Sequence, residues 1–202
     1  MATSITGPLL TVGLFLLGLC AWREQLLAKR RFEVAEQVLT ATYAALDALS
    51  AIRSVGMWGG EMDAIEVAPD TPKREAERIK TAGAYFARAQ RTREAFASLR
   101  TAQVLAEIHL DPRAAKAIDE IFRAQREALA AVDTFYGYGM NDEAGMEPAQ
   151  VANLRNLKQK LRRTFTEMRQ ADGSPEPTDE VSQQLDAARD VIESVCRPRL
   201  SQ

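Results

Sequence analysis

The sequence predicts an all-α protein in which an N-terminal transmembrane helix continues into a cytoplasmic antiparallel bundle of about five helices. An uncharged apolar run opens the chain, and the rest carries apolar residues at three- and four-residue steps. Aromatic residues make up only 6% of the chain, which favours helix formers over strand formers. The 202 residues, 46% of them hydrophobic, suffice for one domain with a proper core.

The predicted anchor is residues 5–22, ITGPLLTVGLFLLGLCAW. As a helix this run spans about 27 Å, close to the roughly 30 Å thickness of the hydrocarbon layer. No Lys or Arg precedes it, whereas Arg23, Lys29, Arg30 and Arg31 follow it. The positive-inside rule therefore predicts a single-pass protein of the inner (plasma) membrane, with its N-terminus outside and its C-terminal domain in the cytoplasm.

Three other interpretations of this run fit less well. A cleaved signal peptide should begin with basic residues, and none is present. The LGLC at 17–20 is reminiscent of a lipoprotein site, but Leu19 stands where a small residue is expected. A buried soluble helix is the third alternative. We interpret Cys20 as a small apolar residue of the span, with reversible acylation as an alternative.

Five helices are expected after the anchor, at about 23–55, 72–109, 112–136, 148–170 and 178–197. Thr71-Pro72 and Asp111-Pro112 are helix-start signals, and Gly56 is a natural residue to end the first helix. Pro198 is expected to end the last. The domain organisation is then anchor 1–22, bundle 23–197 and tail 198–202. Spacing near 3.5 residues favours nearly parallel packing of long helices, as in coiled coils.

Alternating helix directions should bring the linkers 56–71 and 137–147 together at the end distal from the membrane. Both linkers are acidic, and the opposite end should be basic and attracted to anionic lipid. The expected distal acids are Glu61, Asp63, Glu66, Asp70, Asp142, Glu143 and Glu147, and the expected proximal cations are Lys29, Arg30, Arg31, Arg113, Lys116, Arg162, Arg163 and Arg169. Four cations, Lys73, Arg74, Arg78 and Lys80, are exceptions near the distal end.

Motifs that carry catalysis are missing from the sequence, which has no P-loop, GxSxG, HExxH or paired cysteines. The one histidine, His109, and the cysteine Cys196 are far apart in the chain, so we expect no catalytic site, metal or cofactor. The net charge of -2 argues against a nucleic-acid partner.

Two charged features have alternative interpretations. The predicted helix at 148–170 is rich in Lys and Arg, which suits lipid or nucleic-acid contact, but its cations can equally pair with acids of the last helix. Arg93 falls one heptad after Phe86, where a charge either fixes helix register or extends from the edge of the apolar stripe.

The segment AIRSVGMWGGE, residues 51–61, leaves the first helix through three glycines and a tryptophan. AIRS followed by a Gly-Gly-Glu loop and a long helical hairpin resembles a group of bacterial single-span membrane proteins with a cytoplasmic helical region. The resemblance covers residues 5 to about 135 and implies this topology but no activity. The candidate binding residues are Arg53, which could reach Glu61, and the distal-loop residues Trp58, Gly59, Gly60, Glu61, Tyr136 and Tyr138.

The leading functional interpretation is therefore a membrane-anchored, non-catalytic helical scaffold that contacts lipid through its span and either a protein partner or a second copy. The alternative is a membrane-tethered sensor that binds a small molecule at the distal glycine- and aromatic-rich loops.

Overall fold

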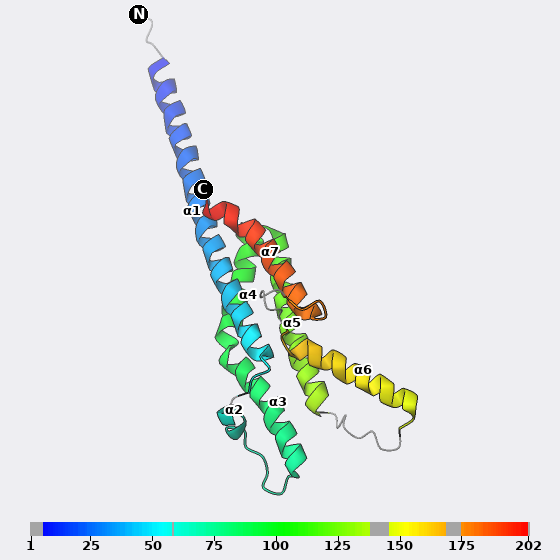
Figure 1. Cartoon of the computed structure of the whole chain (residues 1–202). Coiled ribbons are helices and arrows are strands. Elements are labelled where there is room, and N and C mark those ends of the chain that lie inside the picture. Colours follow the sequence, from blue (N-terminus) through cyan, green and yellow to red (C-terminus); the bar gives the residue numbers. More distant parts are fainter. Residues whose placement is uncertain (1–5, 58, 138–145, 169–174, 202) are drawn as a thin grey trace, which may run out of the picture.

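The computed structural model describes residues 6–57, 59–137, 146–168 and 175–201, with side chains from residue 18 onward. All secondary-structure elements in this part are helices (Figure 1). They are α1 (Thr6–Arg53), α2 (Gly59–Asp63), α3 (Lys73–Arg91), α4 (Arg93–His109), α5 (Pro112–Gly137), α6 (Pro148–Phe165) and α7 (Glu180–Leu200). The predicted all-α class and the helical bundle are confirmed.

Helix α1 is a single helix of 48 residues, and its N-terminal part stands outside the bundle (Figure 1). Side chains 18–32 are all exposed, and continuous burial begins at Val34. Within the described part of the chain, no helix combines the length and apolar character needed to cross a membrane. The side chains of residues 1–17 lie outside the described residues, and they include 5–17, which make up most of the predicted span.

The core lies where α1, α4, α5 and α7 pack against one another, with α3 covering α5 and the distal half of α1. One face of α1, from Val34 to Ile52, is buried there, as the sequence pattern predicts. Small residues alternate with larger ones in this cluster, for example Ala45 and Ala106 with Leu49 and Leu99. Alanine at a helix contact allows the two axes to approach closely, which fits a tightly packed bundle.

The predicted helix at 72–109 is two helices, because the chain breaks at Thr92. The Thr92 hydroxyl donates to the carbonyls of Arg88 (3.1 Å) and Ala89 (3.2 Å). A threonine that bonds back to the preceding turn bends a helix. This break and the short helix α2 account for seven described helices where about five are expected.

Helix α6 is the main departure from a regular antiparallel bundle. It packs against α5 near its C-terminal end and then projects sideways (Figure 1). Phe165 is its one buried side chain. The end of α7 also differs from expectation, since Pro198 lies inside this helix, in its last turn, and does not end it. A proline there removes one helical hydrogen bond near a terminus, which is tolerated more easily than in a helix interior.

Candidate functional site

Arg53, the last residue of α1, is 1% exposed and holds α1 to the segment between α6 and α7. Its guanidinium donates to Asp179 Oδ1 (2.7 Å) and to the Ser182 hydroxyl (2.9 Å). It also donates to the carbonyls of Arg163 (3.3 Å), Thr164 (3.1 Å) and Thr166 (3.0 Å) at the end of α6. The last carbonyls of a helix lack partners within the helix, so Arg53 satisfies the C-terminus of α6.

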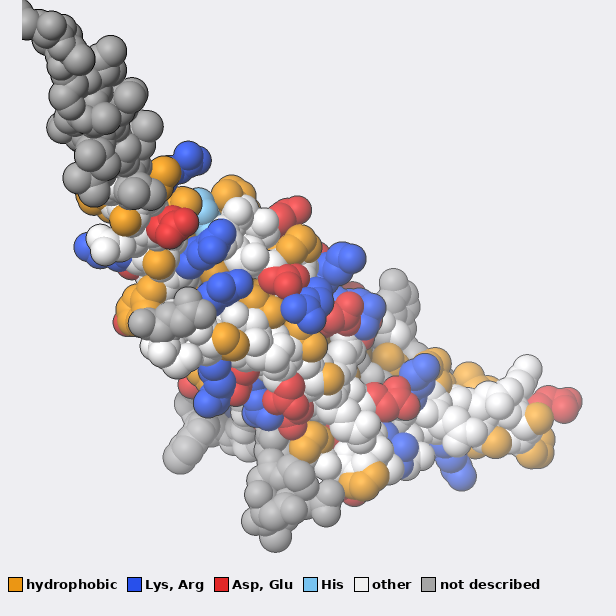
Figure 2. Space-filling view, turned by 90° about the horizontal axis from the view of Figure 1, so that it is seen from above, with side chains coloured by type: hydrophobic (Ala, Val, Ile, Leu, Met, Phe, Trp, Pro, Cys, Tyr) orange, Lys and Arg blue, Asp and Glu red, His pale blue; other side chains and the backbone are white. Residues whose placement is uncertain are grey.

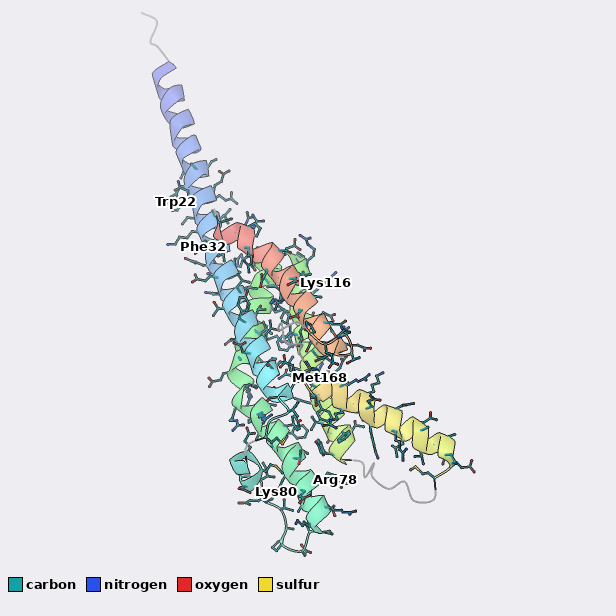
Figure 3. All side chains as sticks on the ribbon, in the orientation of Figure 1. Trp22, Phe32, Arg78, Lys80, Lys116 and Met168 are labelled. Carbon is teal, nitrogen blue, oxygen red and sulfur yellow. The ribbon has the colours of Figure 1, made fainter. Side chains whose placement is uncertain are left out.

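Asp179 is the N-cap of α7 and is completely buried. Its carboxylate accepts hydrogen bonds from the Ser182 backbone (2.9 Å) and hydroxyl (2.7 Å) and from the Met168 backbone (2.9 Å). Burial raises the pKa of this carboxyl, but these donors and Arg53 together bring the pKa below its ordinary value. Asp179 is therefore a buried anion that joins the start of α7 to Met168, where α6 meets the bundle (Figure 3).

A second buried arginine, Arg88 of α3, holds the other side of the same helix end. Its guanidinium donates to the carbonyls of Ala51 (3.4 Å), Ser54 (2.8 Å) and Gly56 (2.5 Å), at and beyond the end of α1. It also pairs with Glu61 at 2.6 Å. Gly56 was expected to end the first helix, and α1 ends three residues before it, at Arg53. Arg88 satisfies the open carbonyls at this helix end from the side of α3.

Four aromatic rings pack together next to the Arg88 network. Tyr85 of α3 and Phe165 of α6 have ring centroids 5.4 Å apart, and Phe135 and Tyr136 of α5 lie against Phe165 at 5.3 and 5.9 Å. Met57, from the segment after α1, packs against this cluster. Burial raises the pKa of Tyr85 and of Tyr136, so both phenols stay neutral at ordinary pH. The rings fill the space between α3, α5 and α6.

The predicted site residues therefore separate into different environments. Arg53 and Glu61 do not pair with each other, because Arg53 binds Asp179 whereas Glu61 binds Arg88 and the exposed Arg91. Gly59 and Gly60 begin α2 and are exposed, with open space where a Cβ would stand. Tyr136 belongs to the aromatic cluster. Trp58 and Tyr138 lie outside the described residues.

Arg88, Asp179 and Tyr85 are the important residues that sequence reasoning missed. The sequence pattern placed Phe86 on the buried face of α3, but Phe86 is 42% exposed, and Tyr85 and Arg88 are buried in its place. The sequence did contain a signal that these two residues are buried together, because Tyr85 and Arg88 are three residues apart and so share a helix face. Arg93, which the heptad spacing placed at the edge of the apolar stripe, is exposed.

An open groove of about 930 Å³ runs between α5, α6 and α7. Apolar side chains, among them Ala131, Leu157, Leu161 and Val181, form part of its wall. Lys160 and Arg163 of α6 also line the groove, together with the acids Glu127 and Glu180. It lies where α6 leaves the bundle at an angle.

The distribution of charge differs from the expected basic and acidic ends. Arg163 lies beside Arg53, at the end of α1 far from the N-terminus, so Arg162 and Arg163 are not membrane-proximal as expected. The cause is that α6 joins the bundle there and does not run back along it.

The distal end is also less acidic than expected. Arg88 and Arg91 offset the charge of Glu61, and Arg78 and Lys80 also lie toward this end (Figure 3). Asp142, Glu143 and Arg169 lie outside the described residues.

The acids of α7 were one possible set of partners for the cations of α6. Asp186, Asp190 and Glu193 each pair with Arg189 of α7 itself. Glu193 also pairs with Arg197 and accepts a hydrogen bond from Tyr43 of α1 (2.6 Å). The ion pairs therefore lie within α7, and the hydrogen bond from Tyr43 links α7 to α1.

No protein-family model, curated protein or solved structure matches this chain. Among the described residues, no group of three or more His, Cys, Asp and Glu side chains is arranged to hold a metal ion. The site thus consists of two arginine–carboxylate networks and an aromatic cluster, which join the ends of α1, α3, α5, α6 and α7.

Proposed function

We propose that this protein is a membrane-anchored helical scaffold, held by residues 5–22 in the inner membrane of a bacterium, with its bundle in the cytoplasm. The observation that carries the proposal is the continuous helix α1, whose N-terminal part stands outside the bundle (Figure 1). Leu19, Trp22, Leu26 and Leu27 on this part are 44–60% exposed.

A projecting helix of this kind is poorly suited to water. Full burial of each large apolar side chain gains about 1.5–3 kcal/mol, which these side chains forgo while exposed. A helix without packing partners is also only marginally stable. A lipid bilayer removes both costs, and the cations Lys29, Arg30 and Arg31 that follow suit its cytoplasmic surface.

The scaffold role is supported by what the charged and aromatic residues of the site already do. Arg53, Arg88 and Asp179 satisfy helix ends. The ring of Tyr136 packs on Phe165 and Tyr85. These contacts favour a structural role over a sensor that uses the same side chains to bind a small molecule.

Helix α6 is the part of the bundle best placed to contact a protein partner. It carries five cations, Arg155, Lys158, Lys160, Arg162 and Arg163, and no acid. Its Leu157 is 43% exposed and lines the groove. A basic helix beside a groove with a partly apolar wall fits an acidic amphipathic segment of a partner.

The anchor is tested by extraction of membranes with alkaline carbonate. The wild-type chain should stay in the pellet and float with the vesicles. The variant L14R/L17R places two charges in the span and should release most of the chain, because each costs about 2.5–3.5 kcal/mol there. The matched control V104R adds a cation at an exposed position of α4 and should not release the chain. A wild-type chain that is extracted by carbonate contradicts the proposal.

The partner surface is tested by photo-crosslinking in intact cells. A photoreactive residue at Leu157 should give an adduct with one acidic protein, and the same residue at Ile79, which is 40% exposed on α3, should not. The groove variant K160E/R163E should abolish the adduct. An adduct between two copies of this chain would indicate self-association, and equal adducts at both positions would contradict a role for α6.

A further inference from the structure

Another concave surface lies at the opposite end of the bundle, where the end of α7 meets α1. It is a cleft of about 280 Å³ lined by Ala28, Lys29, Arg31 and Phe32 of α1 and by Arg199 of α7. The lining therefore contains three cations and no acid. We propose that this cleft binds the phosphate of an anionic lipid headgroup and so seats the bundle on the membrane surface; this inference rests on the proposed anchor.

The position of the cleft along α1 fits the headgroup layer. Six helical residues separate Trp22, at the expected boundary of the hydrocarbon, from Ala28, which corresponds to about 9 Å. The polar layer on each side of a bilayer is about 5–7 Å thick. Arg and Lys side chains are long enough to span the remaining few ångströms and place their charges among phosphates.

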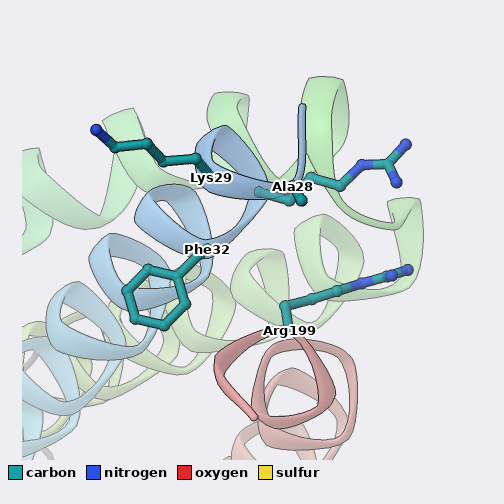
Figure 4. Close-up of a pocket in the computed structure, with 5 residues that line it drawn as sticks. Ala28, Lys29, Phe32 and Arg199 are labelled. Atoms are coloured by element: carbon teal, nitrogen blue, oxygen red, sulfur yellow. The ribbon is translucent and has the colours of Figure 1, made fainter. Parts of the chain in front are cut away.

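The directions of the side chains suit a layer of headgroups better than a small enclosed anion. Figure 4 shows Lys29 and Arg199 extending in opposite directions from the cleft, with the ring of Phe32 on the side of Lys29. Arg199 is half-buried, whereas Lys29 and Arg31 are exposed. Cations on both flanks of a shallow cleft can contact neighbouring phosphates of one surface at the same time.

Apolar side chains accompany these cations, which is the pattern of a helix at a membrane interface. Leu26 and Leu27 are 47% and 48% exposed between Trp22 and the cleft, and Ile108 at the end of α4 is 66% exposed. Hydrophobic side chains lie beside both basic and acidic ones where the grey N-terminal segment enters the bundle (Figure 2).

Two acids near this end of the bundle, Asp111 and Glu33, pair with arginines that do not line the cleft. The pKa of Asp111 is lowered mainly by its hydrogen bonds with Arg113. The positive charge of Arg199 also lowers this pKa but contributes less. The Arg113 guanidinium lies 2.9 Å from this carboxylate. Glu33 pairs with Arg30, which does not line the cleft.

The test uses the full chain in neutral detergent, titrated calorimetrically with three probes. Dioctanoyl phosphatidylglycerol should bind saturably, dioctanoyl phosphatidylcholine should not, and inorganic phosphate should bind at least tenfold more weakly. Each cation near a membrane surface changes affinity about fivefold, so R31Q/R199Q should weaken binding of the phosphatidylglycerol roughly 25-fold. The control K116Q removes an exposed cation outside the cleft and should change binding less than twofold.

Three results would overturn the proposal: R31Q/R199Q binds like wild type, K116Q loses as much affinity as R31Q/R199Q, or inorganic phosphate binds as tightly as the lipid. The first shows that the cleft binds no phosphate, the second shows diffuse attraction, and the third shows a site for a free anion. Because the titration is done in detergent, its outcome is separate from that of carbonate extraction. Failure of the anchor and failure of the cleft can thus be told apart.

Discussion

The guanidinium of Arg53 lies 2.7 Å from the carboxylate of Asp179, and both side chains are almost completely shielded from water. The pair joins the end of α1 to the start of α7, which are 126 residues apart in sequence. A buried ion pair is costly to form but much more costly to break from one side, because the remaining charge stays buried.

Replacement of Arg53 should therefore destabilise the bundle strongly. We expect R53M to lower the free energy of unfolding by about 3–5 kcal/mol. R53K should fall between this variant and wild type, since lysine keeps the charge but cannot reproduce the planar fork of donors. The control R91M removes an arginine that is 60% exposed and should cost less than about 1 kcal/mol. Urea unfolding followed by circular dichroism measures all three, and equal losses in R53M and R91M would refute the role of the pair.

Asp179 should also give the bundle a defined pH dependence. Its pKa is lower in the folded chain than the value of about 3.9 in an unfolded chain, so the unfolded state binds more protons between the two values. The stabilisation is present above about pH 4 and is lost as the pH falls through the pKa of the folded state. The free energy of unfolding, measured from pH 6 to pH 2, should therefore fall more steeply for wild type than for D179N. Parallel curves would show that Asp179 does not titrate in this way.

Gly83 of α3 is required where the segment after α2 crosses this helix. A Cβ at Gly83 would lie 2.9 Å from Cγ2 of Ile65. We expect G83A to cost about 1–3 kcal/mol through this overlap. In an I65A background the overlap is gone, and the same change should stabilise the chain by up to about 1 kcal/mol through helix propensity. Thermal unfolding of the four variants gives this double-mutant cycle, and the same sign in both backgrounds would be inconsistent with the contact.

Cys196 should be chemically inert while the bundle is folded. Burial raises the pKa of its thiol to about 11, so about one molecule in a thousand carries the thiolate at pH 8. In a C20S background, iodoacetamide should modify Cys196 at least 100-fold more slowly in native buffer than in urea. Mass spectrometry follows the reaction, and fast modification of the folded chain would show that the end of α7 opens readily.

The local features of the fold were predictable because they depend on neighbours in sequence. The buried face of α1 follows its three- and four-residue spacing. Helix α5 begins at Pro112, and Asp111 caps it by accepting a hydrogen bond from the Arg113 backbone (2.8 Å). The start of the last helix was predicted at residue 178, two residues early, since Asp179 is the cap and α7 begins at Glu180.

The features that were not predictable depend on distant parts of the chain. Arg88 is buried because α3 passes the open carbonyls at the end of α1, and no local pattern reports this. Arg53 holds only the C-terminal end of α6 against the bundle. The amphipathic pattern of α6 does not specify the angle at which the rest of the helix leaves that point. The break at Thr92 lies inside a sequence of good helix formers, where propensity predicts continuity.

The orientation of the chain in the membrane is the most direct test of the account. Two reporters are fused after Gln202 and expressed in a bacterial host: a green fluorescent protein, which fluoresces in the cytoplasm, and an alkaline phosphatase, which is active in the periplasm. The account predicts a fluorescent membrane fraction and an inactive phosphatase. An active phosphatase with a dark fluorescent fusion would contradict it.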